Sequence, residues 1–326
     1  MTFDYWVELS KSARPPDKGE LPASPEEAAW NLASGFVDRC AEWAMRGDDQ
    51  RIESRNRYIE EVASKKEVTS KEEVTSKTFS LPSALSVLES PDFDSAHTGW
   101  PASWLGIKVG FELLTPWYSK DDRVFHVMDN PVHKDRVFGV PYMAASSWKG
   151  LLRWACRMQA GLQKHLREND GKIEGWRDPD WILHLFGNEK GEEEDFHRGA
   201  LVFYPTWFDK IGFEVINPHS RERRAGTQPI YYEVVPIGTN GTLSLLYAPW
   251  PGMKPEAKPG EIMPKLLEAI EALLTTYGIS AKRTVGWGTA KITEWKAYRK
   301  GQAPVQAGTR EELWKAIVNW FREGAP

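Results

Sequence analysis

The chain of 326 residues carries 42 lysines and arginines against 46 aspartates and glutamates, a formal net charge of −4. This balance excludes nucleic-acid binding through bulk positive charge, so such binding would need a local basic surface. A mean hydropathy of −0.52 argues against a membrane span, and two cysteines are too few for a four-cysteine zinc site. We expect a soluble, cytoplasmic protein of about two domains that does not bind membranes.

The first 95 residues differ in pattern from the rest. Residues 25–45 place apolar side chains such as Leu32 and Phe36 at helical spacing, which predicts an amphipathic helix. A charged tract at 64–77, with the near-repeat KEVTS/EEVTS, is typical of a solvated helix or a loose connector. We therefore expect residues 1–95 to form a helical N-terminal extension with a charged connector.

The globular body opens with an alternating segment. Apolar residues alternate with glycine or charged residues over 105–114, which predicts a half-buried strand. A long polar loop at 115–141 follows, and then a helix for which Ser146 or Ser147 is a suitable N-cap. The apolar side of this helix is formed by Trp148, Leu151, Leu152, Ala155, Leu162 and Leu166.

Short strands and two further helices complete the body. A helix is predicted at 262–278, where Gly278 is a suitable C-terminal cap. The order strand, helix, strands, helix, strand predicts an α+β, ferredoxin-like domain with inserted loops over residues 96–298. A C-terminal helix in residues 299–326 begins at Thr309, which has capping-box spacing to Glu312. The predicted strands are 199–205, 212–218, 229–237, 241–249 and 285–295.

The helix after the long loop carries Lys149, Arg153 and Arg157 at positions i, i+4 and i+8. This spacing places three cations on one stripe, next to a helix start that presents free backbone N–H groups and two serines, Ser146 and Ser147. Such a surface can bind a phosphate chain. The alternative is a solvated helix face with surface ion pairs.

A glycine-rich loop at 278–288 places three glycines, Gly278, Gly286 and Gly288, around two cations, Lys282 and Arg283. Glycine permits positive φ and a close backbone approach, so the loop could lie against a ligand backbone while its cations neutralise phosphates. It lacks the Gly-Lys-Ser/Thr spacing of a Walker loop. The alternative is a tight connection between a helix and a strand.

Two other polar clusters could carry chemistry. In the long loop, Asp129 lies between His126 and His133, a set that could hold a divalent cation or perform acid–base catalysis, although no zinc-ligand spacing is matched. The other interpretation of these residues is an ordinary polar surface. A further cluster, which is either a second phosphate contact or an exposed loop, comprises His219, Arg221, Arg223 and Arg224.

Taken together, these motifs resemble the RAMP superfamily, the RNA-binding subunits of type III CRISPR interference complexes. The resemblance covers roughly residues 105–295 and depends on DNPVHKDRVFGVPYMAASSWKGLLR followed by GISAKRTVGWG. The chain departs from the family pattern at three places. Ala144-Ala145 replaces a Pro-Gly, Trp148 replaces a leucine, and Ser280 stands where glycine is frequent.

The resemblance implies a protein that holds a guide RNA by its backbone, with target RNA and other type III effector subunits as partners and no cofactor for RNA binding. Two subunit types remain open. The N-terminal extension and GISAKRTVGWG resemble the Cmr subunit that caps the guide RNA 3′ end. The segment DNPVHKD resembles the repeated backbone subunits, in which an aspartate matching Asp129 serves as a catalytic residue and metal ligand for Mg²⁺- or Mn²⁺-dependent cleavage of target RNA.

Two other classes of protein remain as alternatives. A stand-alone guide-processing endoribonuclease would use His126 or His133 as a general base without a metal. A small-molecule or glycan binder would use some of the sixteen tryptophans as a stacking surface, whereas the simplest interpretation places those rings in a large core.

Overall fold

A computed structural model describes residues 76–78, 91–122, 128–135, 139–188, 197–216 and 230–321. The helix predicted at 25–45 lies outside the described residues, as do His126 and the cluster in 217–229. The charged tract ends differently from the prediction, because its last residues begin a short strand. The strands are β1 (Ser76–Thr78), β2 (Leu105–Leu113), β3 (Tyr142–Met143), β4 (Leu201–Phe203), β5 (Thr206–Trp207), β6 (Lys210–Ile216), β7 (Ile230–Val234), β8 (Asn240–Tyr247), β9 (Ala290–Tyr298) and β10 (Val305–Ala307).

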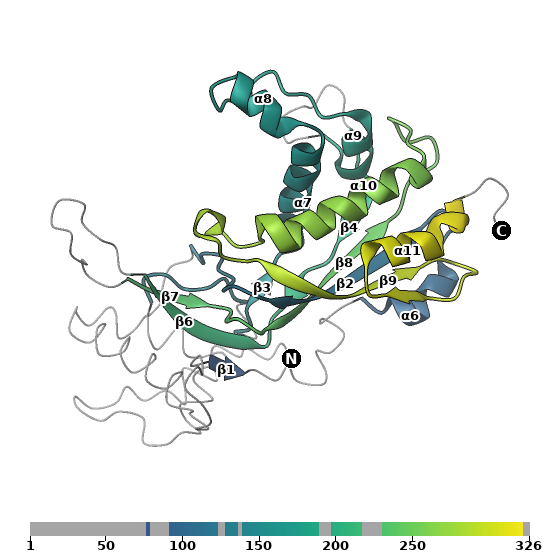
Figure 1. Cartoon of the computed structure of the whole chain (residues 1–326). Helices are drawn as coiled ribbons and strands as arrows, with labels where there is room; N and C mark the ends of the chain where they lie inside the picture. Colours follow the sequence, from purple (N-terminus) through teal and green to yellow (C-terminus); the bar gives the residue numbers. More distant parts are fainter. Residues whose placement is uncertain are drawn as a thin grey trace, which may run out of the picture.

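The helices pack mainly on one face of the sheet, as Figure 1 shows. Among the described residues they are α6 (Phe93–Ala96), α7 (Ala145–Gln159), α8 (Leu162–Glu168), α9 (Asp180–Phe186), α10 (Pro259–Ala272) and α11 (Arg310–Ile317). A π-helical turn at Leu273–Tyr277 continues α10, and short 3₁₀ turns lie at His97–Gly99, Arg283–Val285 and Val318–Phe321. No helix in these described ranges is both long and apolar enough to cross a membrane.

The central sheet has five strands in the order β10-β9-β2-β8-β4, and every neighbouring pair is antiparallel. The alternation predicted for 105–114 is confirmed, because the odd-numbered side chains of β2 enter the main core beneath the helices. Ile107 pairs with Leu245 on β8 and with Ala297 on β9, so β2 lies at the centre of this core. The result is an α+β architecture built on an antiparallel sheet.

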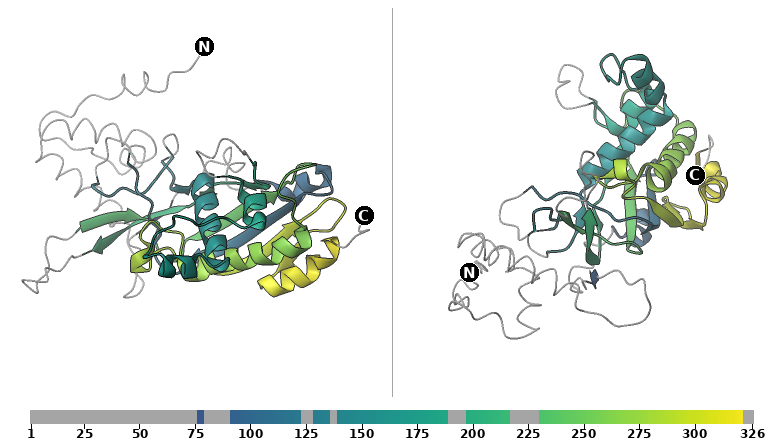
Figure 2. Two further views of the ribbon diagram at one scale, coloured as in Figure 1. Left: turned by 90° about the horizontal axis from the view of Figure 1, so that it is seen from above. Right: turned by 60° about the vertical axis from the view of Figure 1, so that its left-hand side comes forward.

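The layer of helices consists of α7, α10 and α11, with α8 and α9 beyond them (Figure 2). Trp148 and Leu152 of α7 and Leu266 of α10 are fully buried in the main core, as the apolar pattern predicted. Trp117 and Trp295 are fully buried like Trp148, so these three of the sixteen tryptophans have a packing role.

A second, three-stranded sheet has the order β1-β6-β7 and projects from the body as an arm (Figure 2). The strands predicted at 212–218 and 229–237 are confirmed as β6 and β7, which pair antiparallel from Gly212 with Val234 to Ile216 with Ile230. The inner end of β7 is tied to the body by a bridge between Trp117 and Val235. This connection brings β7 next to the segment that follows β2.

Several boundaries differ from the predictions. The helix predicted to begin after Ser146 or Ser147 instead begins at Ala145, because Ala144 has an extended conformation and acts as the N-cap without a side-chain hydrogen bond. It also ends earlier, because Gly161, at φ +105°, separates α7 from α8. The helix α9 was missed. The closing strand starts at Ala290, because residues 285–288 belong to the glycine-rich loop and Thr289 precedes the strand.

Two C-terminal features agree with the predictions. Thr309 caps α11: its hydroxyl accepts the backbone N–H of Glu312. The Glu312 carboxylate accepts the backbone N–H of Thr309 in return, which completes the capping box. Gly278 ends the π-helical turn with φ +78°. The division of the chain into residues 1–95, 96–298 and 299–326 stays a prediction.

Candidate nucleic-acid interface

The glycine-rich loop (residues 278–288) is fastened to the segment that follows β2. The Ile279 N–H donates to the Gly288 carbonyl at 2.9 Å, which closes the loop on itself. The Ser280 hydroxyl lies 3.0 Å from both the backbone N–H and the carbonyl of Tyr118, accepting from the first and donating to the second. Ser280, where the family often has glycine, therefore holds the loop to the body.

The three glycines of this loop have two different roles. A Cβ on Gly278 would lie 2.8 Å from the Trp287 carbonyl oxygen, and one on Gly288 would lie 2.3 Å from the Ser280 nitrogen. These two glycines are therefore required by the packing of the loop against itself. Gly286, at φ +85°, meets no described atom within 4 Å of an added Cβ, so it alone leaves open space where another molecule can approach.

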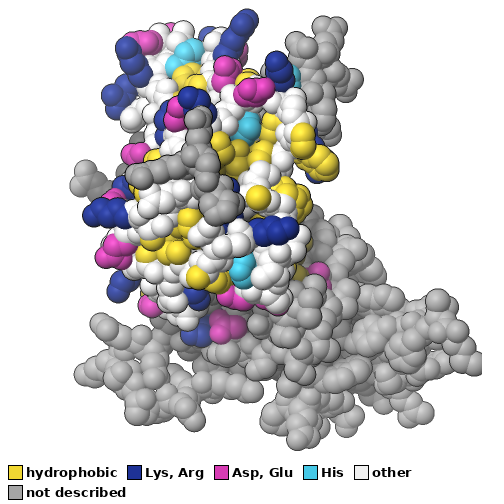
Figure 3. All heavy atoms as spheres, turned by 90° about the vertical axis from the view of Figure 1, so that its right-hand side faces the viewer, with side chains coloured by type: hydrophobic (Ala, Val, Ile, Leu, Met, Phe, Trp, Pro, Cys, Tyr) yellow, Lys and Arg dark blue, Asp and Glu magenta, His cyan; other side chains and the backbone are white. Residues whose placement is uncertain are grey.

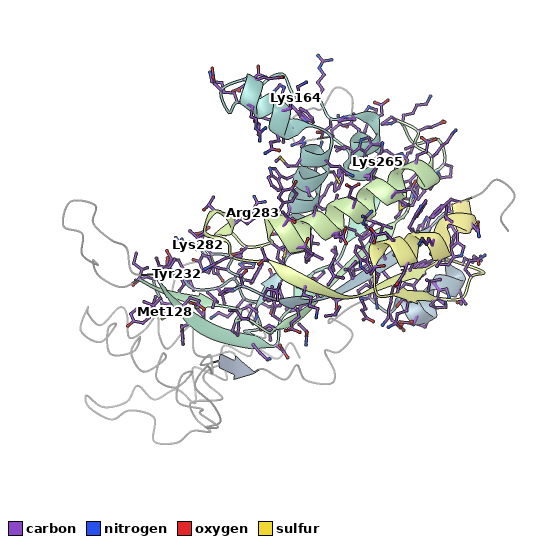
Figure 4. The ribbon with its side chains drawn as sticks, in the orientation of Figure 1. Met128, Lys164, Tyr232, Lys265, Lys282 and Arg283 are labelled. Atoms are coloured by element: carbon purple, nitrogen blue, oxygen red, sulfur yellow. The ribbon has the colours of Figure 1, made fainter. Side chains whose placement is uncertain are left out.

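The two cations of the loop rest on aromatic rings. The Lys282 ammonium lies 4.5 Å from the centre of the Tyr232 ring, and the Arg283 guanidinium lies 4.6 Å from the centre of the Trp154 ring on α7. Such cation–π contacts hold a charge in place without neutralising it. Figure 4 shows Tyr232, Lys282 and Arg283 along one end of the molecule, with Met128 at the same end.

The aromatic support continues beneath the loop. Tyr118, Tyr232 and Trp287 meet edge to face, with ring centres 5.2 to 6.4 Å apart. Among the described residues the buried Tyr118 hydroxyl has no hydrogen-bond partner, and burial raises the pKa of Tyr118 above its usual range. The Nη1 atom of Arg283 is likewise buried without an acceptor in the described part of the chain. Unsatisfied polar groups of this kind need an explanation, and a bound ligand is one.

The cation stripe on α7 is less open than the sequence suggested. Arg153 and Arg157 both donate to Asp178, with Arg153 Nη2 to Oδ2 at 2.6 Å and Arg157 Nε to Oδ1 at 2.6 Å. The Trp176 indole N–H donates to the same carboxylate at 2.9 Å. Two of the three stripe cations are thus held by an internal carboxylate that lies 21 to 25 residues away in sequence.

Lys149 is the exposed cation of the stripe, and within the described ranges it makes no salt bridge. Burial, and secondarily the charge of Arg153, lowers the pKa of Lys149. Ser146 and Ser147 are exposed in the first turn of α7, as a phosphate-binding helix start requires. Lys149, Lys282 and Arg283 are therefore the cations best placed to meet an outside anion.

The setting of these three cations differs from that of the charged side chains at the opposite end of the molecule. On the opposite end of the molecule, shown in Figure 3, basic and acidic side chains are interspersed. The sequence predicted that an acidic chain would need such a local basic surface. Trp154, Tyr232 and Asp178 were missed as parts of it, because each meets its partner through long-range contacts that no periodic pattern encodes.

The aspartate loop (residues 128–135) lies against β7. The Glu233 carboxylate is buried, receives the Val132 N–H at 3.0 Å and binds the Lys134 ammonium at 2.7 Å. The Glu233 N–H donates to the Asn130 carbonyl at 3.0 Å. Asp129 itself is exposed. The loop is therefore fixed close to β7 while its aspartate faces outward.

The described catalytic candidates of this loop, Asp129 and His133, are not part of a metal-binding cluster. Among the described residues, no group of three or more histidines, cysteines, aspartates or glutamates is placed to hold a metal ion. His133 Nδ1 lies 3.9 Å from the buried carboxylate of Asp121, and its ring packs on Tyr142. Catalysis by Asp129 or His133 stays a prediction.

The fold and this surface define an α+β protein in which a cation-bearing glycine-rich loop is held on aromatic rings of β7 and α7. A family model of the RAMP superfamily matches residues 110–291. Because this match covers more than half of the chain, the protein belongs to the RAMP superfamily.

Solved structures and curated proteins add two findings. A chain from the cryo-EM structure of the type III-B Cmr-beta bound to cognate target RNA is 17% identical with a TM-score of 0.39, over 60% of this chain and 61% of that one. A chain from the crystal structure of the Csm3-Csm4 subcomplex in the type III-A CRISPR-Cas interference complex is 16% identical with a TM-score of 0.42, over 68% and 97%. The chain thus spans about 61% of the length of the Cmr-beta chain. No curated protein matches.

Proposed function

We propose that this protein is an RNA-binding subunit of a type III CRISPR effector complex and holds the guide RNA by its sugar–phosphate backbone. One observation carries the proposal. Lys282 and Arg283 are positioned on aromatic rings of β7 and α7, and no described carboxylate pairs with them. Membership of the RAMP superfamily supports RNA as the anion.

The mechanism is binding and positioning. Cations at fixed positions neutralise phosphates, and the open backbone at Gly286 permits a strand to come close. Contacts to phosphates carry little sequence information, so the bases stay free to pair with a target RNA. Other effector subunits would bind the rest of the same strand.

We assign the finer role to the subunit that caps the guide RNA 3′ end in Cmr-type complexes, because the glycine-rich loop and the N-terminal extension favour it. The strand order β9-β2-β8-β4, with α7 after β2 and α10 after β8, supports a ferredoxin-like body. The alternative is a backbone subunit that cleaves target RNA through Asp129. The described residues do not by themselves fit a metal site, so the proposal contains no metal-dependent step.

Replacing Lys149, Lys282 and Arg283 together with alanine tests the proposal. We expect the affinity of the full-length chain for single-stranded RNA to fall roughly 10- to 100-fold near 100 mM salt, because three phosphate contacts are lost. The slope of log K against log salt should become shallower by about 2, at roughly 0.7 per contact. Fluorescence anisotropy with a labelled RNA of mixed sequence measures both quantities.

The matched control replaces three exposed lysines at the opposite end of the folded molecule with alanine. These are Lys258, Lys300 and Lys315. This control changes the net charge by the same amount, so it should shift the affinity only slightly. Equal losses in both triple variants would show that only the net charge matters, and the proposed interface would then be wrong.

A further inference from the structure

Gly150 occupies an unexpected position in α7. It lies in the helix interior, where glycine is unfavourable relative to alanine because it loses more backbone entropy on folding. A Cβ added at Gly150 would meet nothing within 4 Å. Packing among the described residues therefore does not explain the glycine, unlike Gly278 and Gly288, where a Cβ would clash.

The surroundings of Gly150 are cationic. Side chains of a helix lean towards its N-terminus, so Arg153 and Trp154, three and four residues later, flank the surface above Gly150. Lys149 borders the same surface on the side of Arg153, whereas Trp154 lies on the opposite side. The Trp154 ring carries the Arg283 guanidinium, so the glycine-rich loop reaches this part of α7 from the opposite element.

Two of these cations have no counter-charge among the described residues. Arg153 is paired with Asp178, whereas no salt bridge of Lys149 or Arg283 is found in the described part of the chain. The Nη1 atom of Arg283 is buried and has no acceptor there. Burial lowers the pKa of Arg283, and partial burial together with the charge of Arg153 lowers the pKa of Lys149, although its side chain still reaches solvent. A bound anion would raise both pKa values again.

We propose that the bare surface at Gly150 is a seat for one phosphodiester of the bound strand, with Lys149 and Arg283 on its two sides. The inference rests on the proposed function and names a contact site within it. The missing side chain lets the sugar–phosphate backbone approach the helix closely, and Trp154 holds the guanidinium at the edge of the seat. A glycine at this position thus favours ligand binding and lowers the stability of the helix.

Gly150→Ala separates the two effects, because they have opposite signs. We expect the thermal midpoint of the full-length chain to rise by about 1 to 3 °C, since alanine is the better helix former. We expect its affinity for a labelled single-stranded RNA of mixed sequence to fall about three- to tenfold, since the methyl group lengthens the charge contacts. Gly150→Asp should bind more weakly still, because it places an anion in the seat.

Gly99→Ala is the matched control. Gly99 also meets nothing within 4 Å of an added Cβ, but it lies at the end of a 3₁₀ turn next to α6, away from the interface, so its affinity should equal that of the wild type.

Three outcomes overturn the inference. In the first, Gly150→Ala binds RNA as tightly as the wild type. In the second, its thermal midpoint falls, which would mean that packing requires the glycine. In the third, Gly150→Asp binds no more weakly than Gly150→Ala. Each of these leaves the proposed function standing if the wild type binds RNA with a clear salt dependence. A wild type that binds no RNA would contradict the proposed function itself, and the seat with it.

Discussion

Replacing Asp178 with alanine should lower the free energy of unfolding by about 3 to 5 kcal/mol, the usual cost of removing one partner from a buried ion pair. The Asp178 side chain is 2% exposed, and it neutralises both Arg153 and Arg157. Its removal takes the shared carboxylate away from two largely buried guanidinium groups between α7 and the segment before α9. Urea unfolding followed by circular dichroism measures the change.

The pH dependence gives this prediction a second readout. Burial by itself would raise the pKa of Asp178, but hydrogen bonds from Arg157, Trp176 and Arg153 outweigh it and lower the pKa. A carboxyl with a lowered pKa in the folded state stabilises the protein above its unfolded pKa of about 3.9, and this stabilisation is lost as pH falls through the folded pKa. The difference in unfolding free energy between the wild type and Asp178→Asn should therefore be constant near neutral pH. It should decrease below about pH 4.

Glu174→Ala is the control for Asp178, because it removes an exposed carboxylate from the same connecting segment and should change stability by no more than about 0.5 kcal/mol. An Asp178→Ala protein that unfolds at the same urea concentration as this control would contradict the structural role assigned to Asp178.

Replacing Glu233 with alanine should cost about 3 kcal/mol or more of unfolding free energy, because it removes the buried carboxylate that binds the Lys134 ammonium and accepts the Val132 N–H. The effect should also be local, since these contacts tie the aspartate loop to β7. Hydrogen exchange should become faster at the Val132 amide. Glu233→Gln, which keeps an oxygen acceptor but loses the charge, should give an intermediate result.

The comparison for Glu233 is an exposed ion pair. Glu261 lies 3.7 Å from Lys258 with both side chains mostly in solvent, so Glu261→Ala should cost only about 0 to 1 kcal/mol. If Glu233→Ala leaves the exchange of the Val132 amide unchanged, the aspartate loop is held by something other than Glu233.

The sequence predicts the scaffold better than the site because local patterns record local structure. The alternation in β2 and the capping box at Thr309 each involve neighbours in sequence, and both are confirmed. The start of α7 was misplaced because serine is a good cap in general, whereas here the backbone at Ala144 decides the boundary.

The candidate site was predicted only in part for the same reason. The spacing of Lys149, Arg153 and Arg157 showed that the three cations share a helix face, but it could not show that Asp178 takes up two of them. The contact between Arg283 and Trp154 joins residues 129 positions apart, and nothing in the glycine-rich motif indicates it.

Photocrosslinking of the full-length chain to RNA that contains 4-thiouridine, with the attached peptides identified by mass spectrometry, tests most directly whether a ribonucleotide strand lies along this end of the molecule. Crosslinks should concentrate in two peptides, one from the glycine-rich loop and one from the first turns of α7. Crosslinks confined to α11 or to the strands at the far edge of the sheet, with none in those two peptides, would contradict the proposed interface.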